Sequence, residues 1–290
     1  MTIPAARETI QQAGHFSVTN PGQFQATINT LTLDGTEKIA HRCQVAGWCH
    51  PPCSRRNGKR LQGLSLPADL WVVIPAYNEA HSLRGVLLDV CKISPNVVVV
   101  DDCSRDETAD IAYSADVHVC RHPVNLGQGA ALATGIEYAL RRGAARILTF
   151  DADGQHVIED GIVMNEIMTR TGASVVLGSR FLGNAIAISR ARRILLKLAI
   201  LFTRATTGLD LTDTHNGLRL LDRTAAEKIE IRHNRMAHAS EILSQISKLN
   251  LFYVEAPSTV RYTNHTRAKG QKWTGAFTIL FDLLLGGLYR

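Results

Sequence analysis

The feature that most constrains the fold of this chain is a regular alternation, from Leu70 onward, of short apolar runs with helical segments. Five runs rich in Val and Ile predict strands, at 70–75, 97–100, 117–120, 146–150 and 174–179. Because these runs are apolar almost throughout, they are typical of a parallel sheet that is buried on both faces. Helices are expected between them, over 79–91, 105–114, 129–141 and 157–169. The pattern therefore predicts an open, mostly parallel α/β sheet flanked by helices.

The composition is that of a globular protein with a substantial core. Of the 290 residues, 45% are hydrophobic and 20% are charged, which argues against wholesale disorder. The formal net charge of +6 favours an anionic partner, such as a nucleotide diphosphate, a nucleic acid or an anionic membrane surface. The sequence shows no aromatic-and-basic recognition module, so we expect no nucleic-acid partner.

The sequence also bears on where the protein acts. It contains no apolar run of the roughly 20 residues that cross a bilayer, and its first residues lack the pattern of a secretory signal. The six cysteines of a chain this long are expected to be reduced thiols. We therefore expect a cytoplasmic protein that is attached, at most, peripherally to the inner face of a membrane.

The first 66 residues differ from the rest, because they lack sustained periodicity and end in the stretch CHPPCSRRNGKR. We expect them to form a flexible, poorly structured extension of unknown role. They contain five residues of the types that bind zinc, namely His41, Cys43, Cys49, His50 and Cys53. Their spacing lacks the paired C-x2-C pattern of common zinc fingers, so a metal site is not expected there.

Polar segments follow all five predicted strands. In chain order they are PAYNE, DDCSRDE, RHPVNLGQG, DADGQH and SRF. In open α/β sheets, ligands bind beyond the carboxyl ends of the strands. The five segments are therefore expected to converge on one site. The second segment also carries a capping-box pattern, with Ser104 at the N-cap and Glu107 three residues later.

Asp151, Ala152 and Asp153 leave the fourth predicted strand and enter a turn at Gly154. Two carboxylates so close together can address one cation. Mg²⁺ or Mn²⁺ takes one or two carboxylates and completes its shell with water and phosphate oxygens. An Asp-Gly turn that only caps the next helix is the alternative. Because four other polar segments accompany it, we predict a metal held by Asp151 and Asp153, which would neutralise charge on a diphosphate leaving group.

Three further segments are candidates for nucleotide contacts. Asp102 is placed to accept hydrogen bonds from a base or ribose, although helix capping would also explain it. In the first turn, Tyr77 could lie against a base and Glu79 could accept from the nucleoside. The glycine-containing loop that ends at Gly129 suits a phosphate at a helix start, and close packing of the helix on the sheet explains it equally well.

The second half of the chain supplies basic and acidic candidates. Six basic residues and no acidic one lie between Arg180 and Arg204, which predicts a basic amphipathic helix on a membrane surface or near phosphates, or an ordinary solvated helix face. Asp213 could act as a base or orient an acceptor, and a satisfied turn residue is the alternative. Glu241 begins an amphipathic helix, where it could reach the site or only favour the helix dipole.

Taken together, VVIPAYNE, VVVVDDCSRDET, NLGQGAALATG, LTFDADGQH, VVLGSRF and DTHNGLRLL resemble the family 2 glycosyltransferases with a GT-A fold. The nearest subgroup is the dolichyl- or polyprenyl-phosphate sugar synthases. The resemblance implies a GT-A catalytic domain at 67–262, preceded by the 1–66 extension and followed by a basic amphipathic segment at 263–290. The sequence lacks the hydrophobic C-terminal hairpin that many polyprenyl-phosphate enzymes carry.

The resemblance also implies roles for individual residues. The nucleotide would be held by Pro75, Tyr77, Glu79 and Asp102. The metal and the diphosphate would be held by the Asp151-Ala152-Asp153 motif and Gln155. Donor or lipid phosphates would be contacted by Arg180 and Arg192, while Lys269 lies in a region only loosely similar to the family's basic loop. Asp213 matches the family's acidic residue before an Asn/Ser-Gly-x-Arg segment.

We therefore predict an inverting, metal-dependent glycosyltransferase that moves a sugar from a UDP- or GDP-sugar to polyprenyl or dolichyl phosphate in cell-envelope or glycan synthesis. The metal and Arg180 would stabilise the departing nucleoside diphosphate. A lipid phosphate needs little base catalysis, whereas a hydroxyl acceptor would need Asp213, or Glu241 in second place. The alternatives are a transferase acting on a saccharide or protein hydroxyl, and a nucleotide-sugar-binding pseudoenzyme or scaffold.

Overall fold

The structure is a computed structural model that describes residues 49–50, 65–183, 185–186, 190–214, 216–235 and 237–261. For 49–50, 185–186 and 190–198 it describes the backbone alone. The predicted segment at 263–290, and all of the predicted extension except 49–50 and 65–66, lie outside these ranges.

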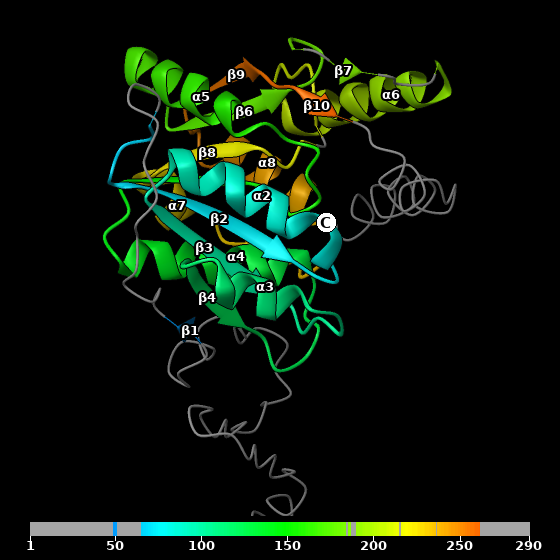
Figure 1. Ribbon diagram of the computed structural model, residues 1–290. Helices are drawn as coiled ribbons and strands as arrows, with labels where there is room; N and C mark the ends of the chain where they lie inside the picture. Colours follow the sequence, from blue (N-terminus) through cyan, green and yellow to red (C-terminus); the bar gives the residue numbers. More distant parts are fainter. Residues whose placement is uncertain are drawn as a thin grey trace, which may run out of the picture.

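Eight strands form one mixed sheet in the order β1-β4-β3-β2-β5-β8-β6-β9 (Figure 1). Their bounds are β1 Cys49–His50, β2 Leu70–Ala76, β3 Asn96–Asp101, β4 His118–Arg121, β5 Arg146–Thr149, β6 Val175–Ser179, β8 Arg219–Asp222 and β9 Tyr253–Pro257. The pairs β4–β3, β3–β2, β2–β5 and β6–β9 are parallel, while β8 runs antiparallel to both β5 and β6. The prediction of a mostly parallel α/β sheet is confirmed. Two short strands, β7 Ala185–Ile186 and β10 Val260–Arg261, pair in parallel apart from it.

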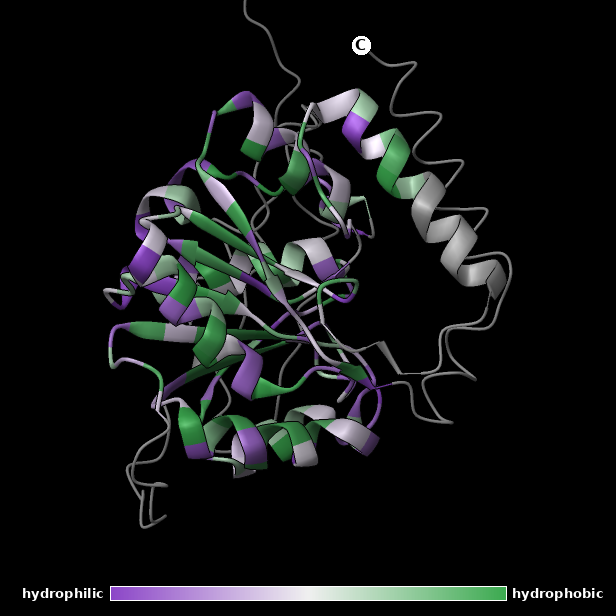
Figure 2. Cartoon of the chain, turned by 90° about the horizontal axis from the view of Figure 1, so that it is seen from above, coloured by the Kyte–Doolittle hydropathy of each residue, from purple (hydrophilic) through white to green (hydrophobic). Residues whose placement is uncertain are grey.

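Helices cover both faces of the sheet. Their bounds are α2 Ala80–Ile93, α3 Thr108–Ser114, α4 Gln128–Arg141, α5 Ile158–Thr171, α6 Arg190–Thr207, α7 Arg223–Lys228 and α8 His238–Lys248. One core joins the sheet to α2, α3 and α5, and a second core joins the opposite face to α4, α7 and α8. Figure 2 shows predominantly hydrophobic strands between helices that carry hydrophilic residues.

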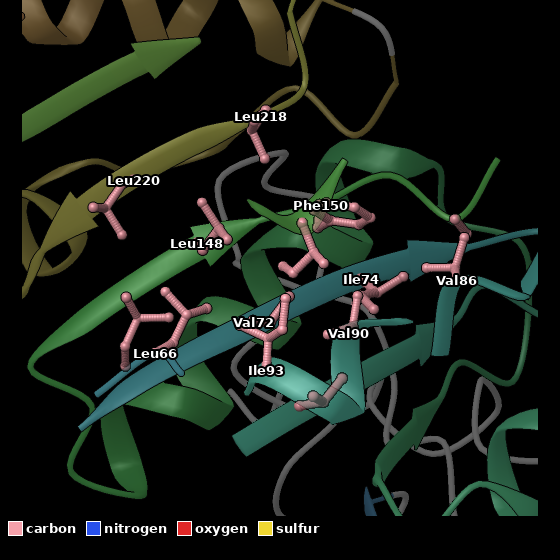
Figure 3. Close-up of a cluster of buried hydrophobic side chains, with 14 of the residues drawn as sticks. Leu66, Val72, Ile74, Val86, Val90, Ile93, Leu148, Phe150, Leu218 and Leu220 are labelled. Atoms are coloured by element: carbon pink, nitrogen blue, oxygen red, sulfur yellow. The ribbon is translucent and has the colours of Figure 1, made fainter. Parts of the chain in front are cut away.

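Alternating side chains of each strand feed these two cores. On β2, Val72 and Ile74 belong to the first core, whereas Trp71 and Val73 belong to the second. Successive side chains of a strand point to opposite faces, so a strand covered on both sides must be apolar at every position. Figure 3 shows part of the first core, where Leu218, directly before β8, and Leu220 of β8 lie beside Leu148. This double burial explains why the predicted strands are continuous apolar runs.

The capping prediction for the second helix is wrong. The helix α3 begins at Thr108 and its N-cap residue is Glu107. The hydroxyl of Ser104 instead accepts a hydrogen bond from the backbone N–H of Asn78, 2.9 Å away. Ser104 therefore ties the turn after β3 to the turn after β2, a long-range contact that a local capping pattern does not reveal.

The expectation of reduced thiols is wrong for one cysteine. Cys120 is disulfide-bonded, whereas Cys91 and Cys103 form no disulfide. The pairing of β1 with β4 places Cys49 opposite Cys120 in the sheet register. Long-range strand pairing of this kind is invisible to an argument from chain length and composition.

In the described part of the chain, no helix is both long and apolar enough to cross a bilayer.

The double burial predicts a strong contrast between two leucines. Leu148 is fully buried on β5, and Leu88 on α2 is 62% exposed. We expect Leu148→Ala to lower the free energy of unfolding by about 2–5 kcal/mol, because it removes transfer free energy and leaves a cavity. The control Leu88→Ala should change it by less than about 0.5 kcal/mol. Denaturant unfolding of both variants measures the difference, and equal losses would contradict this packing.

Candidate functional site

A cavity of about 710 Å³ opens at the carboxyl ends of the strands. Its wall includes nine of the predicted site residues, namely Pro75, Tyr77, Glu79, Asp102, Asp151, Ala152, Asp153, Gln155 and Arg180. They come from the segments after β2, β3, β5 and β6, which the sheet brings to one edge. The expected convergence of polar segments is therefore present in the structure.

The two carboxylates of the Asp151-Ala152-Asp153 motif are held differently. Asp151 accepts from Gln128 Nε2 at 3.2 Å on one oxygen and lies 3.2 Å from His156 Nε2 on the other. Asp153 accepts from the backbone N–H and the Nε2 of Gln155, at 2.9 Å and 2.6 Å. Both side chains are thus fixed at the cavity wall by their immediate neighbours.

The position of Asp151 depends on the absence of a side chain at Gly217. A Cβ atom at this glycine would lie 2.1 Å from Asp151 Oδ2 and 2.7 Å from its Cγ. The segment that contains Gly217 and leads into β8 is anchored to β5, because Thr149 Oγ1 donates to the Gly217 carbonyl at 2.6 Å. The missing side chain at Gly217 therefore lets the chain pass next to the Asp151 carboxylate just before β8 begins.

The pKa values of the two carboxyl groups are shifted in opposite directions. Burial opposes the charge of Asp151, but the hydrogen bond from His156 and the charges of His156 and Arg219 outweigh it and lower the pKa of Asp151. Burial and the neighbouring charge of Asp151 raise the pKa of Asp153. A positive charge placed between them would favour the ionised form of both.

The donor set fits a hard divalent cation that is shared with a ligand. Within the residues that the structure describes, no cluster of three His, Cys, Asp or Glu side chains could enclose a metal by itself. Mg²⁺ is usually held by one or two carboxylates together with water and substrate phosphates, instead of by a complete protein cage. Asp151 and Asp153 at the edge of a large cavity match that arrangement.

Asp102 organises the loop that faces the metal motif. Its carboxylate accepts from the backbone N–H groups of Leu126 and Gly127, at 2.8 Å and 2.7 Å. His122, which is buried, lies 2.7 Å from the same carboxylate and 2.9 Å from Thr134 Oγ1. Asp102 lines the cavity, yet much of its hydrogen-bonding capacity holds this loop in place.

Gly129 packs against the loop before α8. Its backbone N–H donates to the Asn234 carbonyl at 2.7 Å, and a Cβ here would lie 2.0 Å from the His233 carbonyl oxygen. Glu241 secures the same loop by accepting from the backbone N–H groups of Arg232 and His233. Neither Gly129 nor Glu241 belongs to the cavity wall. The structure thus places both residues behind the wall, in loop packing.

Arg180 and Asp213 form a buried ion pair. Arg180 Nε lies 2.6 Å from Asp213 Oδ2, and the same oxygen accepts from the Arg180 backbone N–H at 3.1 Å. Glu255 accepts from the Asp213 backbone N–H at 3.1 Å. Arg180 lines the cavity, whereas Asp213 lies beneath it and is only 3% exposed. The pairing aims Arg180 at the cavity.

Two predicted phosphate contacts remain predictions. The backbone of Arg192 lies in α6, but its side chain is outside the described atoms, as is the whole of Lys269. The cavity residues without a predicted role include His156, Asn216, Arg219 and His238. Arg219 could have been noticed as a lone charge inside the apolar stretch Leu218–Leu221. The other three carry no comparable local signal.

Comparison with known proteins identifies the family. The profile of "Glycosyl transferase family 2" matches residues 71–230. The chain belongs to glycosyltransferase family 2. It is 34% identical over 229 residues to an uncharacterized protein of Methanocaldococcus jannaschii, a match that covers 76% of this chain and 93% of that protein.

Relatives with assigned activities agree with this family, and a solved structure agrees with the fold. The UDP-N-acetylglucosamine--dolichyl-phosphate N-acetylglucosaminyltransferase of Methanococcus voltae is 28% identical, over 74% of this chain and 95% of that protein. The glucosyl-3-phosphoglycerate synthase of Mycobacterium tuberculosis, crystallised with Mn²⁺, UDP and glucosyl-3-phosphoglycerate, superimposes with a TM-score of 0.53 at 17% identity. That match covers 77% of this chain and 80% of the synthase, and it confirms the GT-A fold.

The contact at Gly217 can be tested by adding one methyl group. We expect Gly217→Ala to displace the Asp151 carboxylate and to weaken Mn²⁺ binding, titrated in the presence of UDP or GDP, by roughly tenfold or more. The matched control is Gly85→Ala, because a Cβ at Gly85 has no atom within 4 Å. Gly85 lies inside α2, so this change should raise helix stability slightly and leave Mn²⁺ binding intact. Unchanged Mn²⁺ affinity in a folded Gly217→Ala protein would refute the contact.

Proposed function

We propose that this family 2 glycosyltransferase moves a sugar from a UDP- or GDP-sugar to polyprenyl or dolichyl phosphate, with inversion and with the help of a divalent metal. The observation that carries the proposal is the pair Asp151 and Asp153 at the mouth of a large cavity, in a chain of this family. The names of several relatives, including the polyprenol monophosphomannose synthase of Mycolicibacterium smegmatis, support the acceptor class.

Asp151 and Asp153 would hold Mg²⁺ or Mn²⁺ on the donor diphosphate, where the cation supplies Lewis-acid stabilisation of the departing nucleoside diphosphate. Gln128 and His156 orient Asp151 for this role, and Gln155 orients Asp153. The raised pKa of Asp153 fits a carboxyl group that depends on a cation for its full charge.

The first turn and Asp102 would bind the nucleoside. Tyr77 is 42% exposed at the cavity wall, where its ring is available to a base. Glu79 and Asp102 lie on the same wall, and their carboxylates suit ribose or base N–H and O–H groups. Asp102 would act in two ways, because it also fixes the loop at Leu126 and Gly127.

The state of the two candidate bases favours an acceptor that is already anionic. Asp213 is buried in its pair with Arg180, and Glu241 accepts from two backbone N–H groups. A hydroxyl acceptor would need a carboxylate free to take a proton, whereas a lipid phosphate can attack without one. Arg180, held by Asp213, would instead stabilise negative charge on the reacting phosphates.

The basic sequence of α6 supports a place at a membrane surface. This helix carries four basic residues between 190 and 197 and no acidic residue along its length. Such a segment is attracted to anionic headgroups, close to the lipid that the acceptor phosphate belongs to. We propose a peripheral association at the cytoplasmic face of the membrane on this ground.

Transfer itself is the direct test. With detergent-solubilised polyprenyl phosphate, radiolabelled UDP- or GDP-sugars and Mn²⁺, we expect lipid-linked sugar to form, and Asp153→Asn to reduce the rate by roughly a hundredfold or more because the metal site is lost. Asp89→Asn, at an exposed position on α2, is the control and should retain full activity. Transfer only to saccharide or protein hydroxyls would replace the proposed acceptor. Donor binding without any transfer would favour a scaffold.

The raised pKa of Asp153 gives a pH test that needs no substrate. In the folded protein, Asp153 keeps its proton at pH values above the ordinary pKa of an aspartate. Ionisation of this group therefore lowers the free energy of unfolding as the pH rises through the raised pKa. A divalent cation removes that cost. The increase in Tm caused by Mn²⁺ should therefore grow from about pH 4 to about pH 7. Asp153→Asn should abolish this growth, and a Mn²⁺ effect that is equal at every pH would speak against the site.

A further inference from the structure

Arg219 occupies a position where the fold calls for an apolar side chain. It lies on β8 between Leu218 and Leu220, which both point into the core shared with α2 and α5 (Figure 3). Because successive side chains alternate, Arg219 projects to the opposite face, on the side of Leu221 and the second core. A guanidinium therefore lies at the first residue of an interior strand, where an aliphatic side chain is expected.

This guanidinium is buried and has no direct hydrogen-bond partner in the described part of the protein. Arg219 is only 4% exposed, and what remains exposed lines the cavity. Other arginines contrast with it, since Arg204 donates to the Leu211 carbonyl and Arg223 to the Ala144 carbonyl. No acceptor among the described residues takes the side-chain N–H donors of Arg219, and the side chain lines the cavity, where a ligand can meet these donors.

The side chain keeps its charge under physiological conditions. Burial lowers the pKa of Arg219 to about 10, while the charges of Asp151 and Asp213 oppose that shift. Its neighbour His238 is held by the Arg235 carbonyl, 2.7 Å from Nδ1. Burial and the Arg219 charge lower the pKa of His238, so the imidazole is neutral near pH 7. Arg219 therefore supplies a fixed positive charge at the cavity wall, which Arg180 and Arg235 also line.

A buried cation with unused donors is unfavourable unless an anion meets it. The planar guanidinium matches the oxygens of a phosphate group and can bind two of them at once. The cavity also presents Asp151 and Asp153, so an incoming phosphate would lie near their bound cation and near Arg219 together.

We propose that Arg219 is a phosphate-binding residue of this cavity, which hydrogen-bonds a phosphate oxygen of the donor diphosphate or of the acceptor. The assignment rests on the proposed glycosyltransferase function and adds a subsite to it. The competing explanation is that Arg219 only balances the charges of Asp151 and Asp213. That explanation predicts changes in stability without any selective loss of phosphate-containing ligands.

The experiment compares ligands with and without phosphate on Arg219→Gln. Calorimetric titration with Mn²⁺ present measures affinity for UDP and GDP, and competition measures affinity for uridine and guanosine. Inhibition of transfer by farnesyl phosphate reports on the acceptor side. Arg219→Met keeps the volume of the side chain in an apolar layer and replaces the Gln variant if that protein does not fold. Arg141→Gln, at an exposed position on α4, is the matched control.

If Arg219 binds the donor, its loss should weaken UDP or GDP binding by roughly ten- to a hundredfold and leave nucleoside binding unchanged. If it binds the acceptor, nucleotide affinity should persist while inhibition by farnesyl phosphate weakens by a similar factor. Folded variants that match the wild type for all of these ligands would overturn the proposal, as would an equal loss for nucleosides and nucleotides. A wild-type protein that binds neither UDP nor GDP would instead refute the donor site itself.

Discussion

The site depends on the way β8 enters the sheet. This strand runs antiparallel between β5 and β6, with Arg219 opposite Thr149 on one side and Leu177 on the other. The pairing brings residues 216–218 against the end of β5, where Gly217 leaves room for Asp151. It also carries Arg219 to the cavity wall. The relative positions of Asp151 and Arg219 therefore depend on the pairing of β8 between β5 and β6.

The cavity wall carries charges of both signs. Asp151 and Asp153 stand close enough that the charge of one raises the pKa of the other, which a cation would relieve. Arg219 and Arg180 line the same space, where their positive charges attract an anion, although Arg180 is already paired with Asp213. A metal-bound diphosphate carries both signs within a few ångströms, because the cation bridges phosphate oxygens. The electrostatics of the wall are thus complementary to the bound form of a nucleotide-sugar donor.

The sequence allowed the parallel half of the sheet and the position of Asp151 and Asp153 at the cavity to be predicted, because both follow from local patterns. Apolar runs at β2 to β6 identify buried strands, and polar segments directly after them identify the site edge. The antiparallel strand β8 escaped prediction, since its place depends on pairing with residues of β5 that lie 70 to 76 positions away. Asp213 and Glu241 show the same limit. Each is a carboxylate in a suggestive motif, yet Asp213 is paired with Arg180, 33 positions away, and Glu241 accepts from the backbone of the nearby loop at His233.

The central claim is that Asp151 and Asp153 hold a metal on the diphosphate of a nucleotide. A crystal structure with Mn²⁺ and UDP or GDP, with an anomalous difference map recorded at the manganese edge, tests it most directly. We predict a single strong peak within about 2.5 Å of a carboxylate oxygen of this pair, with phosphate oxygens of the nucleotide completing the shell. A nucleotide bound in the cavity without manganese at the pair, or manganese elsewhere in the protein, would contradict the account.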